Sequence, residues 1–471
     1  MSRLSLDALT ERDLLGRRFH FVGIGGISMS ALARVLMRCG AVISGSDLHA
    51  SELTDLLAEL GAAIFIGHCA EQAQGAEFII YSDAVPRDNP ELAWARAHQV
   101  PVYARSKLLG WLMRQHRSIA IAGTHGKTTT SAMIAWCLEV AGRDPTVLLG
   151  GELSAIGGNA KLGQGPELVA EACEAYDSFL DLQPDLAVVL NIEAEHLDHH
   201  HTESALKESF VRFLSQTRPG GAAVLCWDRP ELRELAETLA VPVIKYGLQV
   251  GEELDFSAAR VTQRGLTTSF ELLEHGRLVA EITIAVPGEH NLLNALATIA
   301  ASRWAGIEFA DLARALSQFR GVKRRFEIMG EAGGVTVVDD YAHHPTEIRA
   351  TLAAARTVFT GRITAIFQPH LYSRTRDFLD EFADSFKQAD RAIITDIYPA
   401  REQPIPGVSA EAIVTLAHQR QPTQDIRFLA PKEVIAQQLA PQLQAGEIAI
   451  TLGAGDVYLV ARNLLAELSR K

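Results

Sequence analysis

The sequence predicts an α/β protein of three domains, with Rossmann-like first and last domains and a central domain built on a P-loop ATPase-like parallel sheet. Short apolar runs alternate with helical patterns along most of the 471 residues, as expected for parallel sheets covered by helices. Two glycine turns, at residues 23–28 and 123–129, each join an apolar run to a helical pattern. Between residues 256 and 286 polar and apolar residues alternate, which predicts extra β elements in the central domain.

The first domain is expected to span residues 1–115. An apolar strand beginning at His20 runs into a turn of the form Gly23-x-Gly25-x-x-Ser28, and Asp47 follows the next predicted strand. An acid about 20 residues beyond such a turn can meet a ribose hydroxyl. Because the third position of the glycine fingerprint is serine, the residues leave three interpretations open: a dinucleotide cofactor, the nucleotide diphosphate of a substrate, or a purely structural turn.

Polar residues follow the later strands predicted in this domain. His68 comes after an apolar run at residues 62–66, Ser82 follows a run at residues 77–81, and Arg105 ends the run that starts at Pro101. Ligands of open parallel sheets bind beyond the carboxyl ends of the strands, so these three residues are candidate contacts.

The central domain, expected over residues 116–323, contains a phosphate-binding pattern. A buried strand at residues 119–122 leads into Gly123-Thr-His-Gly126-Lys127-Thr128-Thr129 and then into a helical pattern. Glycines let the backbone approach an anion, and the helix N-terminus favours negative charge. Lys127 is placed to reach the β- and γ-phosphates, and Thr128 to hold Mg²⁺. The spacing G-x-x-G-K-T is two residues shorter than that of the usual P-loop.

Acids and histidines follow the next two predicted strands. The strand at residues 167–174 ends in Glu171 and Glu174, whose oxygens suit Mg²⁺, and His196 follows the strand at residues 184–192. Since parallel strands end along one edge of a sheet, Glu171, His196 and the phosphate turn are expected to converge. The histidines at 199–201 are interpreted as the solvated start of a helix. A zinc site is the alternative, although no H-E-x-x-H motif or thiol at ligand spacing supports it.

Residues 287–294 precede an alanine-rich helical pattern. His290, Asn291 and Asn294 lie at or near the expected start of that helix. Asparagine side chains at this position either cap the helix or meet an adenine edge.

The third domain, expected over residues 324–471, again alternates strand and helix. Polar residues once more follow its strands, namely Asp339, Asp340, His343, His344, His370 and Arg374. Three α/β parts with one phosphate turn predict a nucleotide-driven reaction assembled between domains.

Composition excludes several classes of protein. The net charge of −13 argues against a general nucleic-acid surface. The five cysteines are scattered and form no C-x-x-C pair, as expected for reduced thiols in a cytoplasm. The first ten residues lack the apolar core of a signal peptide, and no apolar run is long enough to span a bilayer, so we expect a cytoplasmic protein without membrane insertion.

Several motifs together resemble the Mur ligases of peptidoglycan synthesis over nearly the whole chain. The carriers of the resemblance are G-I-G-G-I-S-M-S at 23–30, G-T-H-G-K-T-T at 123–129, E-A-C-E at 171–174, N-I-E-A-E-H-L-D at 191–198, G-E-H-N-L-L-N at 288–294, R-R-F at 324–326, D-D-Y-A-H-H-P-T-E at 339–347 and Q-P-H-L-Y-S-R-T at 368–375. The short form G-T-x-G-K-T is typical of this family.

The resemblance implies three binding sites. A UDP-sugar site is implied at Gly23, Gly25, Gly26, Ile27, Ser28, Asp47, His68, Ser82 and Arg105. An ATP site is implied at Gly123, Thr124, His125, Gly126, Lys127, Thr128, Thr129, His290, Asn291, Asn294 and Arg325. A Mg²⁺ site is implied at Thr128, Glu171 and His196.

The resemblance also implies the reaction. The substrates are expected to be UDP-N-acetylmuramate and L-alanine, joined at the expense of ATP through an acyl phosphate, with Lys127, Glu171, His196, His343 and Arg374 as catalytic residues. The histidines at 343 and 344 and Arg374 are candidates for gripping the amino acid or the leaving phosphate. Other family members carry a carbamylated lysine, whose counterpart is not evident here, since Lys207 lies on a predicted surface helix. We expect a monomer or weak dimer.

Other functions remain open from the residues alone. The nearest alternative is a ligase that adds a whole tripeptide to the same sugar nucleotide in wall recycling. An NAD-dependent oxidoreductase would use the first glycine turn and leave the second idle. A nucleotide-binding regulatory protein would show no turnover.

Overall fold

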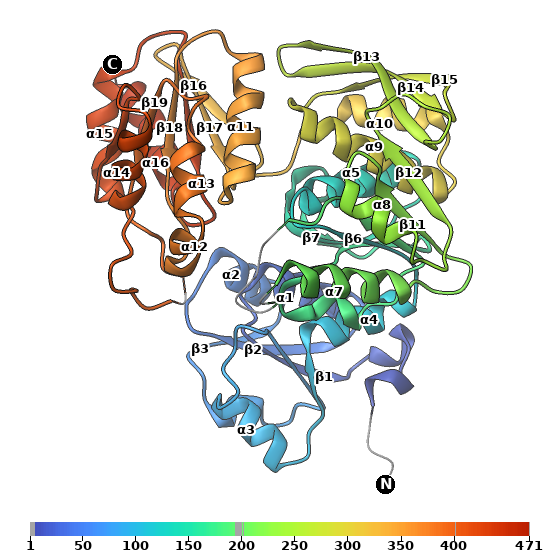
Figure 1. Cartoon of the computed structure of the whole chain (residues 1–471). Helices are drawn as coiled ribbons and strands as arrows, with labels where there is room; N and C mark the ends of the chain where they lie inside the picture. Colours follow the sequence, from blue (N-terminus) through green and yellow to red (C-terminus); the bar gives the residue numbers. More distant parts are fainter. Residues whose placement is uncertain (1–4, 194–199, 201, 401, 471) are drawn as a thin grey trace. The chain divides into compact units, whose positions relative to one another are not determined.

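The computed structural model describes residues 5–193, 200, 202–400 and 402–470, which form three β-sheets with covering helices (Figure 1). Contacts divide the chain into two compact units. The first unit comprises Met1–Ala259, Glu271–Ile282 and Leu293–Leu316, and the second comprises Arg260–Phe270, Thr283–Leu292 and Ser317–Lys471. The mixed α/β class predicted from the sequence is confirmed, while the domain boundaries at residues 115 and 323 stay predictions.

The first sheet has five parallel strands in the order β3-β2-β1-β4-β5. The strands are β1 (Arg18–Val22), β2 (Val42–Asp47), β3 (Ala63–Ile66), β4 (Phe78–Tyr81) and β5 (Val102–Ala104). The helices between them are α1 (Ile27–Arg38), α2 (Glu52–Glu59) and α3 (Pro90–Ala97), and α4 (Arg105–Arg114) follows β5. The strand order reverses between β1 and β4, which places the first glycine turn at the switch point of a doubly wound sheet, where ligands of such sheets bind.

The second sheet has ten strands in the order β15-β14-β13-β12-β11-β10-β6-β9-β7-β8. Its parallel part contains β6 (Arg117–Ala122), β7 (Thr146–Leu153), β9 (Glu167–Glu171), β10 (Leu186–Val189), β11 (Ala222–Cys226) and β12 (Val243–Gly247). The remaining strands are β8 (Gly158–Lys161), β13 (Phe256–Arg264), β14 (Thr267–Glu274) and β15 (Arg277–Ile284). The principal helices are α5 (Lys127–Val140), α7 (Glu203–Ser215), α8 (Pro230–Ala236), α9 (Glu289–Trp304) and α10 (Phe309–Gln318).

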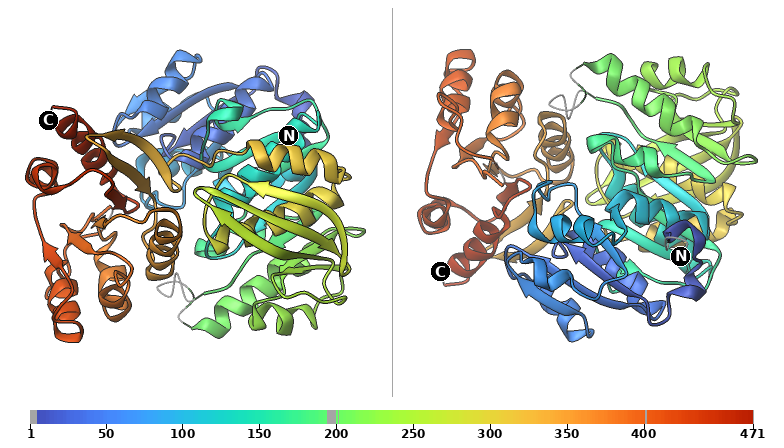
Figure 2. Two further views of the ribbon diagram at one scale, coloured as in Figure 1. Left: turned by 90° about the horizontal axis from the view of Figure 1, so that it is seen from above. Right: turned by 90° about the horizontal axis from the view of Figure 1, so that it is seen from below.

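The third sheet has six strands in the order β16-β17-β21-β18-β19-β20. Strand β16 (Glu327–Ala332) runs antiparallel to β17 (Val335–Asp340), and β18 (Ile363–Phe367), β19 (Arg391–Ile394), β20 (Ile426–Phe428) and β21 (Ile448–Leu452) are parallel. Its helices are α11 (Pro345–Val358), α12 (Tyr372–Asp377), α13 (Leu379–Asp384), α14 (Glu411–Arg420), α15 (Ile435–Leu439) and α16 (Tyr458–Leu468). Two separate apolar clusters pack residues of α11, α13 and α14 on one face and of α15 and α16 on the other (Figure 2).

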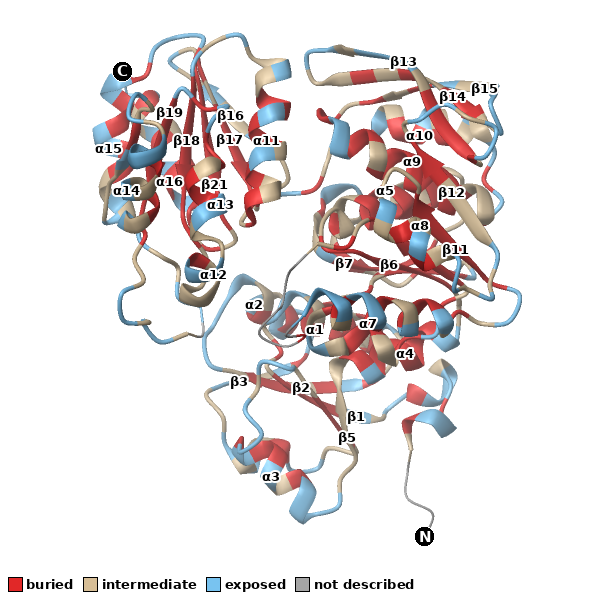
Figure 3. Cartoon of the chain, viewed as in Figure 1, coloured by how far each residue is buried: buried red, intermediate tan, exposed pale blue. Residues whose placement is uncertain are grey.

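The apolar runs of the sequence correspond to the buried strands of the sheets. The strands of the second sheet that carry the phosphate turn and its neighbour, β6 and β10, have almost wholly buried side chains, whereas helices expose one face (Figure 3). Among the described residues, no helix combines the length and apolarity needed to cross a membrane. Two local differences from the sequence prediction concern the second sheet. Strand β9 ends at Glu171 and not at Glu174, and the antiparallel pair β7–β8 was not anticipated.

Candidate active site

The second glycine turn connects β6 to α5, as the sequence predicted. Gly123 and Gly126 have φ of +130° and +85°, which L side chains rarely adopt, and Gly126 precedes the first residue of α5. A Cβ on Gly126 would lie 2.6 Å from Oδ1 of Asn294, so Asn294 of α9 packs directly on the turn. The backbone therefore presents the N-terminus of α5 at a concave turn that only glycine can form.

Residues after β10 hold this turn in place. The Asn191 side chain accepts a hydrogen bond from His125 N at 2.9 Å and donates to His125 O at 3.1 Å. The backbone N–H of Glu193 donates to Thr124 Oγ1 at 2.8 Å, and the Glu193 carboxylate lies 3.2 Å from His125 Nε2. Asn191 and Glu193 belong to a motif noted in the sequence, but their roles as clamps of the turn were not predicted.

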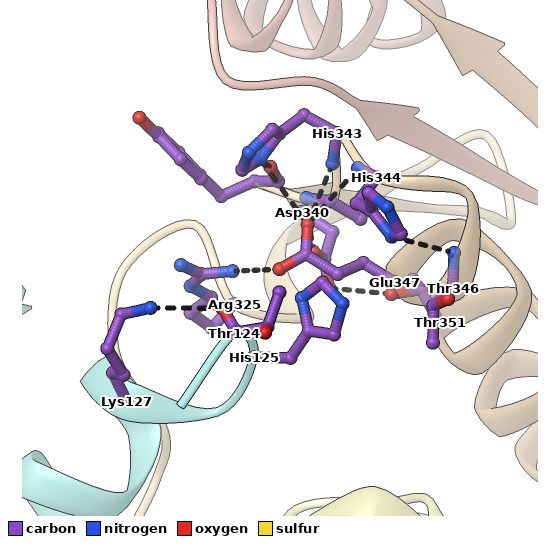
Figure 4. A network of polar contacts seen from close by, with 12 residues as sticks. Thr124, His125, Lys127, Arg325, Asp340, His343, His344, Thr346, Glu347 and Thr351 are labelled. Atoms are coloured by element: carbon purple, nitrogen blue, oxygen red, sulfur yellow. Dashed lines mark hydrogen bonds and ion pairs between the residues drawn. The ribbon is translucent and has the colours of Figure 1, made fainter. Parts of the chain in front are cut away.

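Lys127 is held by a buried carboxylate. Its Nζ donates to both oxygens of Glu174, at 3.1 and 3.0 Å, and to the carbonyl of Gly123. It also donates to the carbonyl of Thr124 at 3.0 Å (Figure 4). The side chain of Glu174 is 2% exposed. Sequence reasoning grouped Glu174 with Glu171 as an oxygen ligand for Mg²⁺, but the structure directs the Glu174 carboxylate to the lysine. A cation is thereby fixed at the mouth of the turn, with its counter-charge beside it.

Glu171 ends β9 next to the strand that carries the turn. Its carboxylate accepts from the Gly150 N–H at 2.6 Å and from Ser131 Oγ at 3.4 Å, and Ser131 lies one helical turn after Thr128. A threonine hydroxyl and a carboxylate are oxygen donors of the kind that Mg²⁺ prefers, so these residues fit the predicted metal. His196, the third predicted ligand, lies outside the described residues.

The interpretation of the neighbouring histidines as solvated is wrong for His200. This residue is 6% exposed, and its Nε2 donates to the carbonyl of Glu174 at 3.4 Å. Its ring supports the backbone of the residue that pairs with Lys127.

The first glycine turn is organised by Asp47. The carboxylate at the end of β2 accepts the Gly25 N–H at 2.8 Å, and Gly23 has φ of +82°. Gly26 precedes α1, whose first two residues are Ile27 and Ser28. Asp47 was predicted as a ribose contact, and the structure gives it a further task, which is to fix the shape of the turn.

The other residues predicted for the first site are Ser82, Arg105 and His68. The Cβ of Ser82 would lie 3.2 Å from a Cβ on Gly23, so Ser82 packs beside the turn. Arg105 is the first residue of α4 and is partly exposed. His68 Nδ1 lies 3.0 Å from Ser46 Oγ and 3.3 Å from the Glu91 carboxylate.

Glu91 is the centre of a buried polar network beneath His68. It has no exposed surface and also contacts His20 Nε2 at 3.2 Å and Ser46 Oγ at 2.7 Å. Burial raises the pKa of Glu91, but hydrogen bonds from His20 and Ser46 and the neighbouring histidines outweigh it and leave the pKa below its ordinary value. The network fixes the ring of His68 through its Nδ1.

In the second unit, the predicted polar residues gather where β17 meets α11 (Figure 4). His344 caps α11, its Nδ1 accepting from Thr346 N at 3.3 Å, and the His343 N–H donates to Glu347 at 3.0 Å. An oxygen of Glu347 lies 3.8 Å from a nitrogen of Arg325. Asp340 accepts from Thr351 at 3.2 Å, and burial raises its pKa to about 6.

The other predicted residues of this unit include His370, whose ring centroid lies 6.0 Å from that of His343. Arg374 lies on α12 with its Nη1 3.4 Å from Nδ1 of His370. Asp339 is buried and pairs with Arg324 at 3.0 Å. Asn291 donates to the carbonyl of Pro287 at 2.7 Å, whereas His290 is exposed.

Comparison with known proteins decides the family. Three family models match successive parts of the chain: "Mur ligase family, catalytic domain" over residues 18–117, "Mur ligase middle domain" over residues 121–302, and "Mur ligase, glutamate ligase domain" over residues 324–455. A UDP-N-acetylmuramate–L-alanine ligase of Geotalea uraniireducens is 46% identical over 451 residues, which cover 96% of this chain and 98% of that protein. The chain belongs to the Mur ligase family.

Further Mur ligases agree in sequence and fold. A UDP-N-acetylmuramate–L-alanine ligase of Symbiobacterium thermophilum is 46% identical over 97% of this chain and 96% of its own length. The crystal structure of a UDP-N-acetylmuramate–alanine ligase from Thermotoga maritima superposes with a TM-score of 0.81 at 29% identity, over 95% of this chain and 98% of that one. A murein peptide ligase from Psychrobacter arcticus shares the fold, with a TM-score of 0.72 at 24% identity over 97% of this chain and 99% of that one.

Proposed function

We propose that this Mur ligase joins L-alanine to UDP-N-acetylmuramate at the expense of ATP, as a step of peptidoglycan synthesis. The observation that carries the proposal is the 46% identity, over 96% of the chain, to ligases named for this reaction. The phosphate turn with Lys127 adds the chemical means, since amide formation from a carboxylate requires activation by a phosphoryl group.

In the first half-reaction, an oxygen of the muramoyl carboxylate attacks the γ-phosphorus of ATP, the bond to ADP breaks, and an acyl phosphate forms. Two anions must approach each other, so the cost of their repulsion dominates the barrier. Lys127 lies in the turn with its Nζ held by Glu174 and by two turn carbonyls. From this position the ammonium neutralises the charge that builds on the transferring group.

Mg²⁺, which we propose is held by Thr128, Glu171 and His196, would supply further neutralisation of the phosphate oxygens. Glu171 is oriented for this role by the N–H of Gly150. The first glycine turn, with Asp47, His68, Ser82 and Arg105, is proposed to hold the UDP-sugar, and the second turn with Asn291, Asn294, His290 and Arg325 to hold ATP.

In the second half-reaction, the amine of L-alanine attacks the acyl carbon, and inorganic phosphate leaves as the amide forms. His343 and Arg374 belong to the second unit, whereas Lys127 and Glu171 belong to the first. We propose that His343 and Arg374 bind the amino acid or the leaving phosphate. The proposed location is the cytoplasm, where ATP and UDP-sugars are available.

A steady-state assay of phosphate release tests the proposal. We expect release to require both UDP-N-acetylmuramate and L-alanine, and the product to have the mass of the alanyl conjugate. Release that depends on the tripeptide, with none on L-alanine, would instead assign the chain to wall recycling, a possibility raised by its structural similarity to a murein peptide ligase. Reduction of NAD by the protein would overturn the proposal, and so would binding of the nucleotide without any turnover.

A further inference from the structure

The hairpin β7–β8 of the second sheet packs against α1, the helix that follows the first glycine turn, within the first unit. Asn159 on β8 makes the polar part of this contact and is 2% exposed. Its Nδ2 donates to the carbonyl of Ile27 at 2.8 Å, and its Oδ1 accepts from Nη1 of Arg34 at 3.1 Å. The amide side chain of Asn159 therefore uses both its donor and its acceptor on α1, a helix that belongs with the first sheet.

The local sequence is built for this contact. Gly157 and Gly158 have φ of +77° and +135°, so the chain turns sharply into β8. A Cβ on residue 158 would lie 3.2 Å from Nη1 of Arg34, which is a tight approach. Glycine at this position therefore leaves room for the guanidinium group beside Asn159.

Each of the two elements in this contact, α1 and the hairpin, lies next to a proposed substrate site. Ile27 is the first residue of α1, directly after Gly26 of the first glycine turn. The same hairpin contains Gly150, whose N–H donates to Glu171 at 2.6 Å, beside the second turn. A shift of the hairpin would therefore move the two turns relative to each other.

We propose that Asn159 is a positioning residue that fixes the first glycine turn relative to the Lys127–Glu171 site. The inference rests on the proposed function, because it assigns the UDP-sugar that carries the carboxylate to the first turn and the γ-phosphate to the second. Reacting atoms must meet at about 3–3.5 Å, and a misplacement of about 1 Å can cost about 100-fold in rate. Asn159 touches neither substrate in this account and acts only by setting the distance between their sites.

The test compares rate with binding in Asn159→Ala. Acyl phosphate formed in a single turnover at saturating ATP and UDP-N-acetylmuramate, trapped with borohydride, should form about 10- to 100-fold more slowly than in the wild type. The dissociation constants of ATP and of UDP-N-acetylmuramate, each measured alone by calorimetry, should stay within about twofold, because the hydrogen bonds from Asp47 and Asn191 that shape the two turns remain. Asn159→Asp keeps the acceptor for Arg34 but loses the donor to Ile27, and should be as slow as Asn159→Ala.

Arg117→Ala is the matched control. Arg117 begins β6 at the end opposite the turn and donates to the carbonyl of Trp304 at 2.9 Å, so its loss also removes a polar link within the first unit. We expect a lower melting temperature in this variant with a saturated rate within about twofold of the wild type. A normal saturated rate in Asn159→Ala or Asn159→Asp would overturn the inference, as would parallel losses of rate and of both affinities. Failure of the wild type to bind either ligand would instead overturn the proposed function.

Discussion

The two glycine turns of the first unit share one design and differ in what holds them. Each joins a buried parallel strand to a helix, with a positive φ at Gly23 in the first turn and at Gly123 and Gly126 in the second. The first turn is fixed by Asp47, a carboxylate from the adjacent strand that accepts the Gly25 N–H. The second is fixed by Asn191, an amide that binds both backbone groups of His125.

This difference separates binding from chemistry. The residues of the first turn, 23–28, include no lysine or arginine, whereas the second turn carries Lys127 with Glu174 as its buried partner. In the first turn a carboxylate fixes the backbone, and Asp47 is also placed to meet a ribose hydroxyl. In the second turn the amide of Asn191 fixes the backbone, and Glu174 holds the ammonium of Lys127 where we propose that the phosphate is transferred. Under the proposed function, the same strand–turn–helix element therefore holds a substrate in one place and stabilises a transition state in the other.

The largest effect is expected at Lys127, which gives the second turn its chemical role. Lys127→Ala should lower kcat by about 1,000-fold or more, the scale of a lost transition-state donor. Phosphate release at saturating substrates measures it, with Lys387→Ala as the control, because Lys387 is an exposed residue paired with Asp384 in the second unit. Normal turnover in a folded Lys127→Ala protein would show that Lys127 gives the second turn no chemical role that the first turn lacks.

Glu174→Gln sharpens the comparison at the partner of the lysine. The amide cannot balance the ammonium charge and accepts with only one oxygen, so Lys127 loses its fixed position. We expect kcat to fall by about 10- to 100-fold while the affinity for UDP-N-acetylmuramate is retained. Kinetics at saturating ATP measure the fall, and the kcat of Glu174→Asp should lie between those of the wild type and Glu174→Gln. A variant with wild-type kcat would show that Lys127 needs no partner.

Asp47→Ala tests the first turn. Loss of the carboxylate frees the Gly25 N–H and should raise KM for UDP-N-acetylmuramate by about tenfold, the value of one hydrogen bond to a charged group. The KM for ATP and the rate at saturation should not change. Asp47→Asn, which keeps an acceptor for the N–H, is expected to lose less. A fall in saturated kcat with unchanged KM would place Asp47 in the chemistry and break the comparison.

The smallest effect concerns the framework under the first turn. Because the pKa of Glu91 is lower in the folded protein than its ordinary value of 4.5, its ionised form stabilises the fold above that pH. This contribution falls as the pH drops below 4.5 and is lost once the pH passes through the folded pKa. Glu91→Gln should therefore lower the melting temperature by a few degrees near pH 7. The difference in melting temperature between this variant and the wild type should narrow toward pH 4. A gap that stays constant with pH would assign the loss to packing alone.

Local signals in the sequence were sufficient for most of the strands and for both glycine turns. Apolar runs predicted β6 and β10, and the glycine pattern predicted where each turn joins its helix. Lys127 was identified from its place in G-K-T, and Asp47 from its distance beyond the first turn. These features depend on neighbours in the chain, which is why a single sequence reveals them.

Pairings between distant residues could not be predicted. The partners of His125 and Lys127 are Asn191 and Glu174, which reach them through the order of strands in the sheet. The hairpin β7–β8 contains paired glycines and no clear alternation, so nothing in its pattern indicated that Asn159 would meet α1. Burial of His200 likewise depends on the segment after β9 and not on the histidine run itself.

Transfer of a heavy oxygen tests most directly whether the two turns bring a carboxylate and a γ-phosphate together. UDP-N-acetylmuramate labelled with ¹⁸O in both carboxylate oxygens is turned over with ATP and L-alanine, and the released phosphate is analysed by mass spectrometry. Attack of the carboxylate on the γ-phosphorus followed by loss of phosphate predicts one ¹⁸O in each phosphate and one in the new amide. Unlabelled phosphate released together with the alanyl product would show that the carboxylate never receives the phosphoryl group, and would contradict the account.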